Sequence, residues 1–95
     1  MRTSLPPLSA LRAFVAVARH LSFSKAAKEL HVTPAAITHQ IHALERDLGT
    51  QLFLRNRKYI TLTRTAEACL PELSQAFEML KSGVANARAV SNRAV

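Results

Sequence analysis

Residues 33–48, TPAAITHQIHALERDL, predict a helix with two different faces. Thr33 can cap the free N–H groups, and Pro34 suits the first helical position because no amide donor is needed there. Apolar residues recur at steps of four, three and four, which predicts a stripe that packs on a core: Ile37, Ile41, Leu44 and Leu48. The second face carries hydrogen-bonding groups and almost no charge: Thr38, His39 and His42, beside the methyl group of Ala35. We interpret this face as a base-reading surface, and we predict that Thr33 at the start of the helix also contacts DNA. The alternative is an ordinary solvated helix face.

Two shorter helices are predicted before this one. Residues 1–7 end in Pro6-Pro7 and favour an extended arm. From Leu8 to about His20 apolar residues follow the helical period, which predicts a first helix with one buried face: Leu8, Leu11, Phe14, Val15 and Ala18. Ser24 is predicted to cap a short helix that runs to about Leu30. Only a few residues then join it to the helix that starts at Pro34. This tight connection predicts a helix-turn-helix motif over residues 23–42, whose second helix enters the major groove.

A small hairpin is predicted after Gly49, which stands where a left-handed helix end is favoured. Gln51 to Arg55 and Tyr59 to Thr63 read as two strands of a wing over residues 51–63. Such a hairpin must lean on the helices, and its candidate anchors are Leu52, Leu54, Ile60 or Leu62. Its cations, Arg55, Arg57 and Lys58, suit backbone phosphates.

A long helix is predicted over residues 64–92, capped by Thr63. Its apolar residues form a heptad seam: Ala66, Leu70, Leu73, Phe77, Leu80, Val84 and Ala87. Pro71 is expected to bend the helix near its start. A helix of this length is too long for a small domain to cover, so we expect the seam to pair with a second copy of the chain. The alternative is a helix that folds back on its own core.

Composition limits the classes of function. The 95 residues suffice for one domain, and 13 Lys and Arg against 6 Asp and Glu give a net charge of +7, which favours a polyanionic partner. An enzyme would need a nucleophile with its base, paired carboxylates or a phosphate loop, and the sequence shows none of these. No cofactor is expected. His39, His42 and His31 lack the further ligands that a metal site needs.

Location is the next expectation. The lone Cys69 excludes an internal disulfide and favours a reducing compartment. Arg12 and Pro6-Pro7 interrupt the N-terminal apolar run, so a signal peptide is not expected. No stretch has the apolar length of a membrane span. A soluble, cytoplasmic protein with no membrane partner is therefore predicted.

From about Leu8 to about Arg88, these motifs occur in the order and at the spacing that are typical of one protein family. Residues 22–30 (SFSKAAKEL), 32–41 (VTPAAITHQI), 43–49 (ALERDLG) and 52–55 (LFLR) resemble the N-terminal DNA-binding domain of LysR-type transcriptional regulators. The AAITHQI version is similar to the subset that includes the glycine-cleavage and β-lactamase regulators. The resemblance implies a mainly α fold, with three helices and a two-stranded β wing in a winged helix-turn-helix, followed by a linker helix that forms a dimeric coiled coil.

The resemblance also implies roles for individual residues. Ser22 and Ser24 match contacts to the DNA backbone, Pro34 and Ala35 match positions that touch bases, Thr38 and His39 match a pair that meets bases and phosphates, and Arg55 and Arg57 match the wing. Pro34 stands where Gln is common and His39 where Arg is commoner, so two base-reading contacts of the family are altered. Ala66 replaces the usual Gly. The family's C-terminal effector domain has no counterpart in these residues, so we expect no small-molecule effector to bind this chain, although a full-length regulator would bind one.

The sequence therefore predicts the DNA-binding part of a bacterial transcriptional regulator, dimeric on an interrupted inverted repeat of double-stranded DNA. The recognition helix, residues 34–47, would lie in the major groove and the wing on phosphates. The alternative is a dimeric architectural protein that coats DNA without reading its sequence. A third possibility is an interaction module that acts only through its heptads and does not bind DNA.

Overall fold

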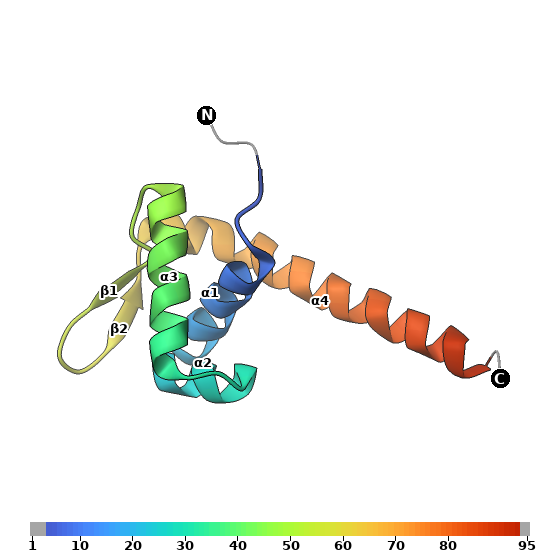
Figure 1. The fold of residues 1–95 in the computed structure, drawn as a ribbon. Helices are drawn as coiled ribbons and strands as arrows, with labels where there is room; N and C mark the ends of the chain where they lie inside the picture. The colour runs from blue at the N-terminus through green and yellow to red at the C-terminus, as the bar shows by residue number, and fades with distance from the viewer. Residues whose placement is uncertain (1–3, 94–95) are drawn as a thin grey trace.

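The computed structural model of the chain describes residues 4–93, so the first three residues of the predicted arm lie outside the described part. Every predicted element is present and in the predicted order (Figure 1). The elements are α1 (Leu8–His20), α2 (Phe23–Leu30), α3 (Pro34–Leu48), β1 (Phe53–Arg55), β2 (Ile60–Leu62) and α4 (Arg64–Arg93). The fold is thus mainly α, with a hairpin between the third and fourth helices.

The core lies where α1, α2 and α3 meet. Its largest fully buried side chains are Phe14, Val17, Ile37, Ile41, Leu44 and Leu52. Ala26 and Ala27 of α2 are also buried, and their small side chains let α1 and α3 approach α2 closely. Two residues predicted to share this core are instead exposed, Leu8 by 57% and Leu48 by 45%. Each stands at the outer end of its helix, so the helical period alone placed them on the buried face wrongly.

Side-chain caps set the starts of α2 and α3. Thr33 Oγ1 accepts a hydrogen bond from the Ala36 N–H at 3.1 Å, which confirms the predicted cap of α3. The cap of α2 is Ser22, not Ser24 as predicted: Ser22 has extended backbone, and its Oγ accepts from the Lys25 N–H at 3.1 Å. Phe23 already has helical geometry, so Ser24 lies inside the first turn. Gly49 ends α3 with φ at 73°, as predicted.

The hairpin is antiparallel, with Phe53 opposite Leu62 and Arg55 opposite Ile60. Leu52 and Phe53 are its buried anchors, and Ile60 and Leu62 pack against the core less completely. The predicted anchor Leu54 is 52% exposed, because side chains alternate along a strand and the adjacent Phe53 takes the inward position.

The helix α4 is longer than the domain that supports it. Thr63 Oγ1 accepts from the Ala66 N–H at 3.2 Å and caps it, and the helix continues through Pro71. Ala66 is fully buried in the chain's own core, and Leu70, Leu73 and Phe77 pack against that core. In the first half of the seam, Ala66 is therefore covered by the chain's own core, and the other three residues are covered only in part. In the second half Leu80, Val84 and Ala87 are exposed, and Figure 1 shows this half extending away from the other helices.

Within residues 4–93, no helix combines the length and the apolar character that crossing a membrane would need.

Candidate nucleic-acid interface

An open groove of about 630 Å³ runs between the helix-turn-helix motif and the hairpin. The starts of α2 and α3 form one side, and the hairpin with its connecting loop forms the other. Seven of the residues predicted to bind DNA line it together: Ser22, Ser24, Pro34, Thr38, Arg55, Arg57 and Lys58. Residues up to 36 positions apart in the sequence therefore meet at one surface.

The other predicted residues lie around this groove rather than in it. Thr33 and Ala35 are exposed at the start of α3, and His39 is exposed one turn further along the helix. His42 is exposed as well and lines a smaller hollow of about 300 Å³ between α3 and β1. Pro34 and Thr38 thus point to the groove, while Ala35, His39 and His42 form the adjoining outer face of the same helix.

The groove is strongly cationic. Arg55, Arg57, Lys58 and Lys25 line it, and none of its described lining residues is Asp or Glu. Sequence reasoning did not select Lys25, because a single Lys on a short helix does not reveal that it faces the hairpin. Charges of one sign that line a concave surface reinforce one another's potential and attract a polyanion.

Asn56 organises the loop that carries two of these cations. Its Oδ1 accepts hydrogen bonds from the N–H groups of Lys58 at 2.9 Å and Tyr59 at 2.8 Å. Its own N–H donates to the Tyr59 carbonyl at 3.1 Å. Asn side chains in tight turns often accept a hydrogen bond from the backbone N–H two residues further on. The Asn in the predicted connection was therefore a sequence signal for this turn. The loop holds Arg57 and Lys58 exposed at the end of the hairpin.

An aromatic cluster joins the hairpin to the helices. The Phe53 ring lies 5.6 Å from that of Phe14 in α1 and 5.9 Å from that of Phe23 in α2, measured between centroids. The Arg55 guanidinium carbon lies 3.9 Å from the centroid of the Phe23 ring. Arg55 is therefore packed on a helix although it belongs to a strand.

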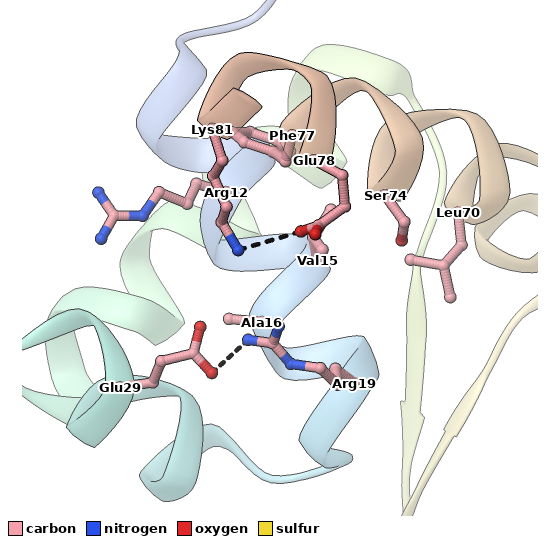
Figure 2. Close-up of a pocket in the computed structure, with 10 residues that line it drawn as sticks. All are labelled: Arg12, Val15, Ala16, Arg19, Glu29, Leu70, Ser74, Phe77, Glu78 and Lys81. Carbon is pink, nitrogen blue, oxygen red and sulfur yellow. Dashed lines mark hydrogen bonds and ion pairs between the residues drawn. The ribbon is translucent and has the colours of Figure 1, made fainter. Parts of the chain in front are cut away.

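A second groove, of about 540 Å³, lies between α1 and α4 and has an apolar floor that includes Val15, Leu70 and Phe77 (Figure 2). Ion pairs lie along it. Arg19 contacts Glu29, and Lys81 Nζ lies 3.0 Å from Glu78 Oε2. This groove contains none of the residues predicted to bind DNA.

Glu29 also accepts from His20, whose Nε2 lies 2.7 Å from Oε1, so one carboxylate ties the end of α2 to the end of α1. Partial burial by itself raises the pKa of Glu29. The hydrogen bonds and charges of His20 and Arg19 together outweigh it, and the pKa is lowered.

The described residues include no cluster of three or more His, Cys, Asp and Glu side chains that could hold a metal ion. Cys69 is half-buried in α4, where its Sγ donates to the Ala66 carbonyl at 3.6 Å. Burial, with a smaller contribution from Glu72, raises the pKa of this thiol. A raised pKa keeps the thiol protonated, which fits a packing role.

Three helices, a hairpin wing and a long following helix define a winged helix-turn-helix protein. The family model described as "bacterial regulatory helix-turn-helix protein, lysR family" matches residues 8–67. This chain belongs to that family.

Named relatives lie in the subset that the sequence resembles. The chain is 48% identical over 80 residues to the glycine cleavage system transcriptional activator of Escherichia coli K12, covering 84% of this chain and 26% of that protein. It is 51% identical over 74 residues to the transcriptional activator AmpR of Pseudomonas aeruginosa, covering 78% of this chain and 25% of that protein. The chain therefore spans about a quarter of the length of these regulators.

Solved structures share the fold. The CbnR DNA-binding domain in complex with DNA superposes with a TM-score of 0.76 at 35% identity, covering 90% of this chain and 99% of that one. The BenM DNA-binding domain bound to catB site 1 DNA gives 0.81 at 28% identity, covering 90% of this chain and 97% of that one. The oxidized form of OxyR from Corynebacterium glutamicum gives 0.83 at 29% identity, covering 90% of this chain and 28% of that one.

Proposed function

We propose that this chain binds double-stranded DNA in a sequence-dependent manner, as the DNA-binding part of a LysR-type transcriptional regulator. The observation that carries the proposal is the cationic groove, which borders the uncharged polar face at the start of α3. The CbnR and BenM domains, whose structures are DNA complexes, have this fold over almost their whole length and support the proposal.

The two surfaces divide the work. The start of α3, with exposed Ala35 and His39 and half-buried Thr38, enters the major groove and reads base edges and thymine methyl groups. The groove holds the adjacent phosphates through Arg55, Arg57 and Lys58, helped by the Ser22 and Ser24 hydroxyls. Phosphate contacts provide affinity and fix the register of the protein on the duplex, whereas base contacts provide specificity.

A second copy of the chain pairs through α4. The seam residues left exposed are Leu80, Val84 and Ala87, and Met79 and Val90 nearby are exposed by 77% and 66%. Exposed apolar side chains along one helix favour a helical partner, and the same helix of another copy supplies a matching seam. The apolar floor beside Phe77 lies next to this seam and extends the surface that a partner helix covers. Ala66 takes no part, because the chain's own core buries it.

A symmetric dimer presents two copies of α3, so the preferred DNA is an interrupted inverted repeat. In a full-length regulator, a small-molecule effector would be bound outside these 95 residues.

The competing function is an architectural protein that coats DNA through the cationic groove alone. Selection of binding sites from random duplex DNA separates the two. Sequence-dependent binding predicts enrichment of two related half-sites in opposite orientation at a fixed spacing. If the protein retains DNA but no sequence is enriched, the result would support the architectural function. No salt-dependent retention at all would support a pure interaction module.

A further inference from the structure

We propose that Phe23 is a positioning residue for DNA binding, because its ring fixes the direction in which Arg55 presents its guanidinium to a phosphate. The proposal rests on the proposed function and adds a residue that acts on DNA binding through Arg55. Its basis is the contact in which the Arg55 guanidinium carbon lies 3.9 Å from the Phe23 ring centroid.

The contact spans two parts of the fold. Phe23 is the first residue of α2, directly after its Ser22 cap, and Arg55 is the last residue of β1. Both side chains line the cationic groove. A strand end next to a loop would ordinarily leave a long side chain free to adopt many rotamers. Here the ring provides a surface on one side of the guanidinium.

The ring itself is held in place. The Phe23 and Phe53 rings meet edge to face, with centroids 5.9 Å apart and planes at 68°. Phe53 is 5% exposed and packs against Phe14, which is fully buried. Phe23 is therefore fixed by the core on one side and contacts the surface side chain of Arg55 on the other.

The geometry suits arginine in particular. A guanidinium is planar, so it can stack on an aromatic face while the N–H groups at its edge remain free for a phosphate. A lysine ammonium cannot combine the two in this way. A side chain already held in its binding conformation loses less conformational entropy when it binds, which strengthens the complex without a new contact to DNA.

The test is a double-mutant cycle on a duplex selected from random DNA. Phe23→Leu keeps an apolar side chain but removes the aromatic face, Phe23→Tyr keeps the face, and Arg55→Ala removes the cation. We expect Phe23→Leu to weaken binding about two- to fivefold, the range of an exposed cation–π contact, and Phe23→Tyr to restore it. The salt dependence of binding should be unchanged in Phe23→Leu and lower by about one in Arg55→Ala, because only the latter removes a charge.

The cycle separates positioning from a merely structural role. In the Arg55→Ala background, Phe23→Leu should have no further effect on affinity. An equal loss in both backgrounds, or a Phe23→Tyr variant as weak as Phe23→Leu, would overturn the proposal. If Phe23→Leu lowers thermal stability, the cycle is measured at a temperature at which circular dichroism shows all four proteins folded.

A readout without DNA distinguishes failure of this inference from failure of the proposed function. In the free protein, the Arg55 δ protons should show a ring-current shift in NMR spectra that disappears in Phe23→Leu. Absence of that shift in the wild type would contradict the geometry. If the wild type shows the ring-current shift but does not bind DNA, the proposed function is overturned, and the role of Phe23 with it.

Discussion

The Glu45 carboxylate in α3 accepts a hydrogen bond from the backbone N–H of Leu52, with Oε2 2.8 Å from the nitrogen. The same oxygen lies 3.5 Å from the Phe53 nitrogen. Leu52 is fully buried and Phe53 begins β1, so one carboxylate joins the proposed recognition helix to the base of the wing. Together with the aromatic cluster, this contact fixes the position of the wing relative to α3, the two surfaces proposed to bind DNA.

Replacing Glu45 with Ala should therefore lower the free energy of unfolding by about 1–3 kcal/mol, because a buried N–H loses its acceptor. Glu45→Gln keeps an oxygen acceptor and should cost less. Chemical denaturation of the three proteins measures the difference. Equal stability of Glu45→Ala and the wild type would mean that solvent satisfies the Leu52 N–H.

Base reading and phosphate binding should respond differently to mutation. Thr38→Ala and His39→Ala should change which duplexes are preferred, because these side chains lie on the face that is proposed to enter the major groove of DNA. Arg57→Ala should weaken binding to all duplexes alike and lower the salt slope by about one. Titrations of a small panel of duplexes at several salt concentrations test both. Equal losses on every duplex for both kinds of variant would contradict the division of labour.

The sequence predicts the elements and seven of the residues that line the cationic groove, because periodicity, caps and turn residues are local. Ser22, Thr38 and Arg57 are each predicted from their own stretch of sequence, and the fold brings them together in one groove. What the sequence missed depends on tertiary contacts. No local pattern places Lys25 opposite the hairpin, stacks Arg55 on Phe23, or aims Glu45 at Leu52.

The heptad seam shows the same limit. Its spacing is regular from Ala66 to Ala87, yet the chain's own core buries Ala66, covers the next three seam residues in part and leaves the second half exposed. A periodic pattern records that a face is apolar, but it does not record what covers that face. Ser24 and Leu54 were misplaced by one or two residues for a related reason, since the exact start of a helix or strand depends on its neighbours.

The distal seam offers a clean test of dimerisation. Leu80 and Val84 are about half exposed, at 49% and 48%, so replacing both with Lys should leave the winged helix-turn-helix folded. We expect the double variant to be monomeric by light scattering. Its melting temperature should equal that of the wild type when both values are extrapolated to low protein concentration. Leu73 and Phe77 are poorer choices, because they pack against the core and charged replacements there would unfold the domain. A double variant that remains dimeric would place the interface elsewhere.

The Glu29 ion pairs should make a small contribution that depends on pH. The pKa of Glu29 is lowered in the folded protein, so its contribution is fully present above the usual value of 4.5 and is lost as pH falls through the folded value. Because the pair is exposed, we expect less than about 1 kcal/mol. The stability of the wild type minus that of Glu29→Gln, measured by denaturation, should be constant near neutral pH and shrink below about pH 4.5. A difference that grew on acidification would contradict the sign.

The measurement that tests the central claim most directly is the ratio of two dissociation constants at one salt concentration. One is for the duplex obtained by selection, and the other is for a scrambled duplex of the same length and composition. A protein that reads bases through α3 should bind the selected duplex at least about 10³-fold more tightly. Affinities that agree within about threefold would mean that the cationic groove alone holds the DNA.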